Sequence, residues 1–334
     1  MRPAGRTLPL NAPTQTPPHV LNGERRELDD PRAGRISYYV AGPESSGRSG
    51  RPSAEVPILL VHSINASASA HEVHPLFEAF RQRRPTYAID LPGYGHSERS
   101  DRTYRQQLMV DGLLAVIARM RADHGGSVVD ALAVSISCEF LAKAALAEPA
   151  ALRSLALVSP TGFARNAPTR GPPEADCGRP AVLRVLNVSW IGQPLFKLLR
   201  SPASIRFFLR KTWGRKEIDE EFFRVSCRMA RFPGAHRAPF HFLSGFLFGA
   251  DMPTVYSQLT HPVWMVHGTR GDFTDYRKAD RIVDKENWAI SVLPTGALPY
   301  FEMPETFVEH YDEVLEQIDA GRPVSTAKEK GPRR

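Results

Sequence analysis

Short, unbroken apolar runs alternate along this chain with stretches of helical periodicity, and this alternation constrains the fold more than any other feature of the sequence. Such runs suit strands that are buried on both faces of a parallel sheet. Stretches with apolar residues three and four positions apart supply the helical crossovers that parallel strands require. The strand-like runs before residue 160 are residues 35–41, 56–61, 86–89, 128–134 and 155–158, and the helical stretches are residues 75–83, 105–121 and 138–147.

The alternation stops after residue 162 and returns near residue 259. The intervening stretch holds helical patches, 14 of the chain's 30 aromatic residues, and 15 basic against 7 acidic residues. Strand-like runs then reappear at residues 262–266 and 288–293, and a last helix is predicted over residues 305–319. We therefore predict an α/β core made of residues 35–162 and 259–320, with a helical cap formed by residues 163–258.

Three segments are predicted to lie outside the packed core. Residues 1–34 carry six of the 29 prolines and are expected to form a flexible leader. Residues 44–54 are rich in Ser, Gly and Arg and suit a solvated hairpin loop. Residues 321–334, with five basic residues against one acidic residue, are expected to form a flexible basic tail.

Composition excludes several classes of protein. No apolar run approaches the roughly 20 residues of a membrane-spanning helix, and the first 34 residues lack the apolar region of a secretory signal. The three cysteines, Cys138, Cys177 and Cys227, are too few for a disulfide framework and lack zinc-ligand spacing. We therefore expect a cytoplasmic protein without a metal or a cofactor. The net charge of +7 is not accompanied by any nucleic-acid-binding motif, so no nucleic-acid partner is predicted.

A candidate nucleophile stands at the junction of a strand and a helix. Ser135 directly follows the apolar run 128–134 and precedes the helical stretch 138–147. A serine on a tight strand-to-helix turn projects its hydroxyl above the sheet, and the residues two positions before and after it must be small. These residues are Ala133 and Ser137. The alternative interpretation is an ordinary serine at a helix N-terminus.

Two further loops follow predicted strands. The loop His-Ser-Ile-Asn comes after the run 56–61, and backbone N–H groups there, with that of Ile136, could bind one developing oxyanion. Asp272 places a carboxylate just past the run 262–266, at the end of the sequence His-Gly-Thr-Arg-Gly-Asp.

In the order of these motifs the chain resembles the α/β-hydrolase superfamily, over residues 35–162 and 259–320. The most specific match is the sequence Asp-Leu-Pro-Gly-Tyr-Gly-His-Ser at residues 90–97. The resemblance implies a mainly parallel, eight-stranded sheet flanked by helices, with a helical cap inserted after the sixth strand.

The same resemblance implies a catalytic triad of serine, acid and histidine in that order along the chain. Ser135 matches the nucleophile of the family and Asp272 matches the acid. Ile64 and Ile136 match the residues whose amides form the oxyanion hole, and Ser63 stands where glycine is usual.

The triad histidine is missing from its expected place. In relatives it follows the last strand, in a pattern like Gly-His-x-Pro-x-x-Glu-x-Pro, and residues 296–304 match this pattern except that Ala297 replaces the histidine. A different loop register would place Tyr300 there instead. A serine hydroxyl without a base is a weak nucleophile, and removing the base from one well-studied protease lowers turnover about a millionfold. A tyrosine, with a reference pKa of about 10, is a poor substitute.

Other histidines suit packing or surface roles better than the role of base. His62 matches a position outside the triad, and His310 is predicted to face away from the strand ends. The remaining alternatives are His71, His74, His96, His236 and His241.

The predicted cap is rich in phenylalanine and in basic residues. Its aromatic side chains either line an acyl or aromatic substrate pocket or, for most of them, pack the cap onto the core. They include Phe207, Phe208, Phe222, Phe223, Phe240, Phe242, Phe246 and Phe248. The cap's net charge of +8 either attracts anionic substrates or pairs with residues 259–320, whose net charge is −7.

These features predict a serine hydrolase acting on a small ester, thioester or lactone, with a small apolar or acyl compound as its substrate. The alternative is a catalytically silent homologue that keeps the pocket for a ligand or a partner. A lyase or a cofactor-free oxygenase is a third interpretation. Ser135 argues against the dehalogenase and epoxide-hydrolase branches, which use a carboxylate at this position.

Overall fold

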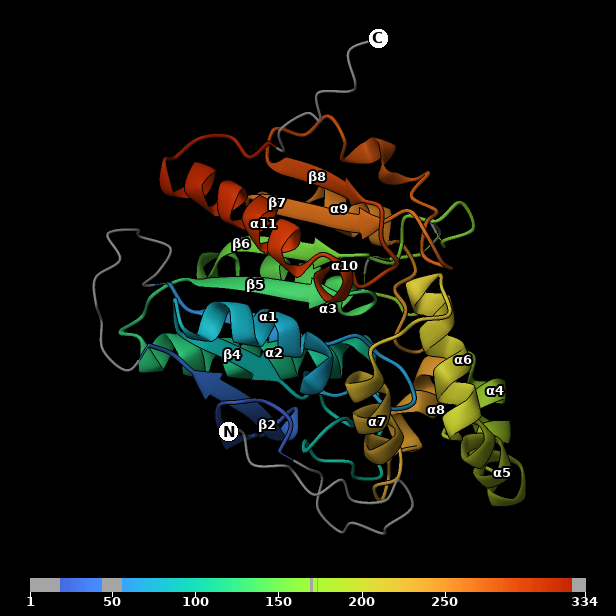
Figure 1. The fold of residues 1–334 in the computed structure, drawn as a ribbon. Coiled ribbons are helices and arrows are strands. Elements are labelled where there is room, and N and C mark those ends of the chain that lie inside the picture. Colours follow the sequence, from blue (N-terminus) through green and yellow to red (C-terminus); the bar gives the residue numbers. More distant parts are fainter. Residues whose placement is uncertain (1–18, 44–55, 169–170, 173, 326–334) are drawn as a thin grey trace.

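The computed structural model describes residues 19–43, 56–168, 171–172 and 174–325. Within them one sheet of eight strands has the order β1-β2-β4-β3-β5-β6-β7-β8 (Figure 1). Strand β2 pairs antiparallel with β1 and β4, and all other neighbours are parallel. The strands are β1 (Glu24–Asp30), β2 (Gly34–Ala41), β3 (Ile58–Val61), β4 (Thr86–Ile89), β5 (Val129–Val134), β6 (Leu152–Val158), β7 (Val263–Gly268) and β8 (Trp288–Leu293). The predicted mainly parallel, eight-stranded sheet is confirmed.

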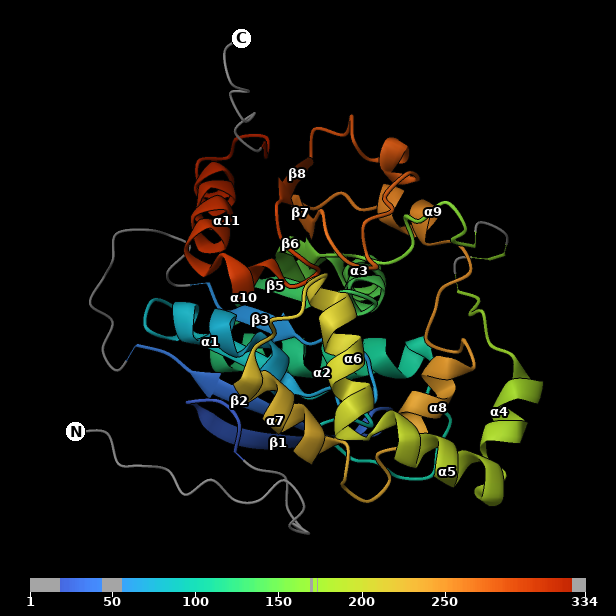
Figure 2. The same ribbon diagram turned by 45° about the vertical axis from the view of Figure 1, so that its right-hand side comes forward.

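Helices cover both faces of this sheet (Figures 1 and 2). One face carries α2 (Gln106–Asp123), α3 (Ser137–Ala147) and α9 (Met252–Ser257), and the other carries α1 (His74–Arg81), α10 (Pro299–Glu302) and α11 (Pro304–Asp319). In β3, Leu59 and Val61 enter the apolar cluster on the first face, whereas Ile58 and Leu60 enter the cluster on the second. Because both faces are covered, the strand consists of four apolar residues without alternation.

The described residues between β6 and β7 form six helices. They are α4 (Pro180–Leu186), α5 (Ser189–Leu199), α6 (Pro202–Trp213), α7 (Glu220–Met229), α8 (Arg237–Leu243) and α9. Helices α4–α8 lie beyond the carboxyl ends of the parallel strands (Figure 1), whereas α9 packs against α3 beside the sheet. Phe163, Met252 and Tyr256 belong to the apolar core. The part that leaves the sheet layers is therefore shorter than the predicted range 163–258.

The prediction of a flexible leader over residues 1–34 is wrong for its second half. Strand β1 pairs with β2 along its whole length, and Val20 and Leu21 are buried. The sequence of β1 is Glu-Arg-Arg-Glu-Leu-Asp-Asp, and such charged residues are typical of an edge strand that faces water. Residues 1–18 of the leader lie outside the described residues.

The other two flanking predictions are tested only in part. The predicted loop 44–54 lies outside the described residues, as do residues 326–334 of the predicted tail. The start of the tail is held in place, because Val324 is 5% exposed and Gln317 hydrogen-bonds both the N–H and the carbonyl oxygen of Ser325. The prediction of a flexible tail starting at residue 321 is therefore wrong for residues 321–325.

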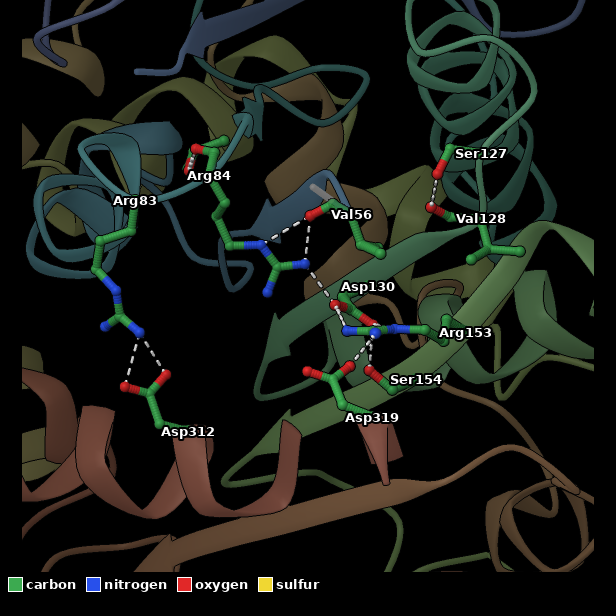
Figure 3. A network of polar contacts seen from close by, with 11 residues as sticks. Val56, Arg83, Arg84, Ser127, Val128, Asp130, Arg153, Ser154, Asp312 and Asp319 are labelled. Carbon is green, nitrogen blue, oxygen red and sulfur yellow. Dashed lines mark hydrogen bonds and ion pairs between the residues drawn. The ribbon is translucent and has the colours of Figure 1, made fainter. Parts of the chain in front are cut away.

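A buried ionic network joins the amino ends of the strands, at the edge opposite the predicted site (Figure 3). The Asp130 carboxylate is completely buried and accepts hydrogen bonds from Arg84 at 2.5 Å and from Arg153 Nε at 2.9 Å. Arg153 Nη1 also donates to Asp319, near the end of α11, at 2.7 Å. Burial alone would raise the pKa of Asp130, but the two guanidinium groups outweigh it and hold the pKa below its ordinary value.

Among the described helices, none combines the length and the apolar content that crossing a bilayer requires.

Candidate active site

The loops that carry the predicted site residues meet at the carboxyl edge of the sheet, because the preceding strands are parallel and in register. Val61 at the end of β3 lies beside Ala133 of β5. Val158 at the end of β6 lies between Val134 of β5 and Val266 of β7. Beyond these ends follow Ile64, Ser135, Ile136, Asp272, Ala297 and Tyr300. The fold thus brings all six residues to one end of the molecule.

Ser135 occupies the tight turn between β5 and α3. Its backbone φ is +57°, in the left-handed region that residues other than glycine rarely adopt. Its N–H donates to the carbonyl oxygen of Val158 over 2.8 Å, and the small residues Ala133 and Ser137 are fully buried. The half-buried Ser135 side chain makes no hydrogen bond within the described part of the chain. This is the geometry of a nucleophile elbow.

The backbone N–H groups of Ile64 and Ile136 are the predicted oxyanion donors. Neither donates to a protein acceptor among the residues that the structure describes. Both side chains are buried, which anchors the loops that carry the two amides. The Ser137 hydroxyl donates to the carbonyl oxygen of His62 over 2.6 Å and thereby ties the first turn of α3 to the loop after β3. Two backbone N–H groups without a protein acceptor, on loops connected by a hydrogen bond, are the kind of donors that an oxyanion hole requires.

A buried carboxylate that no sequence motif predicted holds the loop after β3. Glu72 is 1% exposed, and its two oxygens accept hydrogen bonds from the Ser63 N–H at 3.0 Å and from the Ser63 hydroxyl at 2.8 Å. Burial raises the pKa of Glu72 to about 7, although the bonds from Ser63 act in the opposite direction. A serine where relatives have glycine is the signal that points to this pair.

Asp272 is placed at the surface, where it pairs with a lysine. Its side chain is 54% exposed, and its carboxylate lies 3.2 Å from Lys211 Nζ in the last turn of α6. The two backbones are in close contact, since a Cβ on Gly271 would lie 2.5 Å from the carbonyl oxygen of Lys211. The carboxylate therefore balances a cation of the inserted segment.

The position of the missing histidine is buried under the same helix. Ala297 is 5% exposed; its N–H donates to the carbonyl oxygen of Thr212 over 2.8 Å, and its carbonyl oxygen accepts from the Ser159 hydroxyl over 2.8 Å. Tyr300 is completely buried, and its hydroxyl has no hydrogen-bond partner within the described residues. Burial raises the pKa of Tyr300 well above its ordinary value, so this phenol stays protonated and is not a base.

The histidines that could replace the missing base are engaged elsewhere. His62 Nε2 accepts from the Leu91 N–H at 3.1 Å, and Nδ1 lies 2.6 Å from the carbonyl oxygen of Ser63. Burial lowers the pKa of His62, so it is a neutral ring that joins two loops. His71 and His241 hydrogen-bond the backbone carbonyl oxygens of Val20 and Arg237. His74 lies beside Glu78, and His96 lies beside Asp90. His236 packs against the Phe196 and Phe240 rings, and His267 stacks on the Tyr276 ring. His310 lies on α11, where its Nδ1 is buried. In the described residues no imidazole hydrogen-bonds to Ser135.

A cavity of about 320 Å³ opens beside the elbow helix. Its lining includes Glu139, Thr161, Phe248, Met252, Asp272 and Tyr276. Glu139 is 2% exposed and accepts from the Gln106 amide at 2.9 Å and the Gly249 N–H at 2.8 Å, and burial raises its pKa to about 7. The volume suits a small molecule. No group of three or more His, Cys, Asp or Glu side chains is placed to hold a metal ion in the described ranges.

The aromatic side chains of the inserted segment differ in their surroundings. Phe222 and Phe223 are buried in the same apolar cluster as residues of β3, β5 and β7, which confirms the packing role for this pair. Phe248 lines the cavity. Phe207 and Phe208 are 54% and 52% exposed, so the structure contradicts both a packing and a pocket role for them.

Part of the positive charge of the inserted segment is neutralised by the acidic segment 259–320. Lys211 pairs with Asp272, and Arg215 Nη2 lies 3.3 Å from Glu302, whose side chain is 4% exposed. These pairs fasten the carboxyl end of α6 to the loops after β7 and β8.

Comparisons with known proteins agree with this architecture. A model of the alpha/beta hydrolase family matches residues 58–310. A thermophilic esterase from Thermogutta terrifontis is 15% identical with a TM-score of 0.65, over 89% of this chain and 99% of that chain. Proline iminopeptidase from Mycobacterium smegmatis is 18% identical with a TM-score of 0.63, over 89% and 99%. A meta-cleavage product hydrolase from Pseudomonas fluorescens IP01 is 14% identical with a TM-score of 0.63, over 87% and 97%. A comparison with curated proteins found no match.

Proposed function

Because the chain belongs to the alpha/beta hydrolase family, we propose that it is a serine hydrolase acting on a small ester, thioester or lactone. One observation carries the proposal: Ser135, a partly exposed residue, is held at φ +57° between β5 and α3. A non-glycine residue in this conformation costs on the order of 1–3 kcal/mol and persists where the surrounding structure enforces it. The strain is retained at the position from which a nucleophile is presented.

In this proposal Ser135 Oγ attacks the substrate's carbonyl carbon. A C–O bond forms, and the carbonyl oxygen becomes an oxyanion that the Ile64 and Ile136 amides stabilise; one such donor contributes about 10²–10³ in turnover. The bond to the leaving alcohol or thiol then breaks, and the leaving group takes up a proton from water. A water molecule hydrolyses the acyl-enzyme and releases the acid, which restores Ser135.

The absence of an imidazole beside Ser135 in the described residues sets the expected rate. The serine proton must pass to solvent, and Asp272 has no base to orient because it pairs with Lys211. An oxyanion hole and substrate binding alone still accelerate acyl transfer by about 10³–10⁴ over water. We therefore propose slow turnover on activated acyl compounds.

The substrate's acyl or alcohol portion is assigned to the cavity beside Glu139. The volume of about 320 Å³ lies at the lower end of small-molecule sites. Glu139, which lines the cavity, follows Ile136 by one turn, as its N–H donates to the Ile136 carbonyl at 2.9 Å. Helices α4–α8 act as the cap over this end of the sheet.

A second function, ligand binding without turnover, is favoured by one specific observation. Ala297, which stands where the resemblance predicts the base, is buried against Thr212 of α6 and offers no basic group. In this alternative the molecule keeps the cavity and the oxyanion amides for a small apolar or acyl ligand.

Reaction with a fluorophosphonate probe separates the two functions. The hydrolase predicts slow stoichiometric labelling of Ser135, located by mass spectrometry of peptides, and slow release of p-nitrophenol from p-nitrophenyl acetate. Ser135→Ala, which keeps the same backbone, is the control for both signals. Folded protein that stays unlabelled, yet is stabilised against heat by small esters, would identify the binding function instead.

A further inference from the structure

The outward side of α4, α5 and α6 exposes large apolar side chains. Trp190 and Leu198 on α5 are 79% and 65% exposed, and Phe207 on α6 is 54% exposed. With 100° per residue, Trp190 and Leu198 point away from the buried Gly192 and Phe196 of their helix. We call the outward side chains of these three helices the basic–aromatic face; its apolar members are Val182, Val185, Trp190, Leu198, Phe207 and Phe208.

The segment that forms these helices carries positive charge and no acidic residue of its own. Residues 177–216 contain nine Lys and Arg and no Asp or Glu. Arg184, Lys197 and Arg210 are exposed and make no ion pair with a carboxylate in the described part of the chain. Lys197 follows Trp190 by seven residues, which places both on one side of α5.

The two kinds of side chain are interleaved. Lys211 Nζ lies 5.4 Å from the centre of the Phe207 ring, one turn along α6. Both views place α4 and α5 on the outer side of the molecule, away from α1 and α11 (Figures 1 and 2).

We propose that the basic–aromatic face docks on the surface of a bilayer that contains anionic phospholipids. Helices that lie in the membrane interface combine Trp, Phe and Leu with Lys and Arg in this way. The apolar side chains enter the boundary between head groups and acyl chains. The basic side chains bind the head groups, because anionic lipids attract Lys and Arg near the surface. Docking does not depend on hydrolysis.

The charge and the apolar side chains of the face favour an anionic bilayer over a second copy of the chain and over a nucleic acid. A second copy of the chain would bring the exposed cations Arg184, Lys197 and Arg210 of two faces together, none of them paired with a carboxylate among the described residues, and like charges oppose such self-association. A nucleic acid would satisfy the charge, but its phosphate backbone offers no apolar layer for Trp190, Leu198 and Phe207. A bilayer with anionic head groups satisfies both properties of the face.

Tryptophan fluorescence can report binding of this face to a bilayer. The chain has four tryptophans, of which Trp213, Trp264 and Trp288 are at most 5% exposed and Trp190 is 79% exposed. The full chain is mixed with vesicles of phosphatidylcholine containing about 30 mol% phosphatidylserine, or with pure phosphatidylcholine vesicles. We expect a blue shift of tryptophan emission and co-sedimentation with the anionic vesicles, both reduced in about 0.5 M NaCl.

Matched variants test each part of the face. Trp190→Ser combined with Phe207→Ser, and separately Arg184→Glu combined with Lys197→Glu, are each expected to weaken co-sedimentation about tenfold or more. Val283→Ser and Arg322→Glu change exposed residues elsewhere and should leave co-sedimentation unchanged. Trp190→Phe should abolish the blue shift but retain binding.

The remaining outcomes overturn the proposal. No binding to anionic vesicles excludes the lipid surface. Equal binding to pure phosphatidylcholine excludes the role of charge. A blue shift that depends on protein concentration without vesicles, together with a dimer in light scattering, would assign the face to a second copy. Binding to DNA that survives Trp190→Ser with Phe207→Ser would assign it to nucleic acid.

Discussion

The backbone N–H of Ala297 donates a hydrogen bond to the carbonyl oxygen of Thr212 over 2.8 Å. Thr212 lies in the last turn of α6, so the inserted segment is fastened to the turn where the family carries its triad histidine. The neighbouring Gly296 leaves no room for a side chain, because a Cβ there would lie 2.5 Å from the carbonyl oxygen of Trp213. Helix α6 and the loops after β7 and β8 therefore pack as one unit.

Ala297→His is expected to increase esterase activity. The bond to Thr212 comes from the backbone and survives the substitution, while the imidazole supplies the base that Ser135 lacks. General base catalysis contributes about 10²–10⁴, so kcat/KM for p-nitrophenyl acetate should rise at least about a hundredfold. Ala297→Asn, which adds a polar side chain without a base, is the control. Equal activity of the two folded variants, together with no gain in Tyr300→His, would contradict the explanation that one base is missing.

Ser135→Gly is expected to stabilise the protein, because glycine adopts φ +57° without the steric penalty that serine bears. The free energy of unfolding in urea should rise by about 1 kcal/mol. Ser135→Ala keeps the penalty and should change stability little. Ser159, at φ +47°, is the contrasting position, since Ser159→Gly also loses the hydrogen bond to Ala297. A loss of stability in Ser135→Gly would show that the serine side chain itself is needed for folding.

Glu72→Gln is expected to change how stability depends on pH. Burial raises the pKa of Glu72 to about 7 in the folded protein, from 4.5 for an unperturbed glutamate. The folded state therefore prefers the protonated carboxyl. The resulting stabilisation is complete below about pH 4.5 and is lost as pH rises through 7. Relative to Glu72→Gln, the wild type should lose up to about 3 kcal/mol of unfolding free energy between pH 5 and 8.

The control for this pH series is Glu78→Gln, at a half-buried surface position. Urea unfolding of the wild type and both variants at several pH values supplies the measurement. Glu139→Gln should behave like Glu72→Gln, because burial also raises the pKa of Glu139 to about 7. Parallel stability curves for the wild type and Glu72→Gln would refute a raised pKa.

Asp130→Ala is expected to destabilise the protein by about 3–5 kcal/mol, because it leaves the buried Arg84 guanidinium without its carboxylate. The control is Asp312→Ala, which breaks the more exposed pair with Arg83 in the same region (Figure 3) and should cost less than about 1 kcal/mol. Both values come from urea unfolding. Labelling of Ser135 should not change in the folded variants, since the network lies at the opposite edge of the sheet.

Much of the fold was predictable because a buried strand requires several consecutive apolar residues, which are visible in the sequence. Strands β4 and β8 have the predicted bounds, 86–89 and 288–293. Strand β4 is buried along its whole length, whereas β8 is the edge strand and leaves Val292 47% exposed. Strand β1 was not predicted, because its charged edge sequence does not differ from that of a loop. The candidate site was predictable in part, because the order of the loops along the chain placed Ser135, Ile64 and Asp272.

The amino-acid sequence by itself determined the layered α/β architecture, the residue at each strand end and the presence of Ala297 where the resemblance predicts a histidine. These properties depend on local pattern and order, which a linear chain records directly. Only the tertiary structure decided that Glu72 clamps Ser63, that α6 is fastened to Ala297, and that Phe207 faces water while Phe222 is buried. Contacts between segments far apart in the chain depend on the packing free energy of the whole molecule. This free energy cannot be read from any short stretch of sequence.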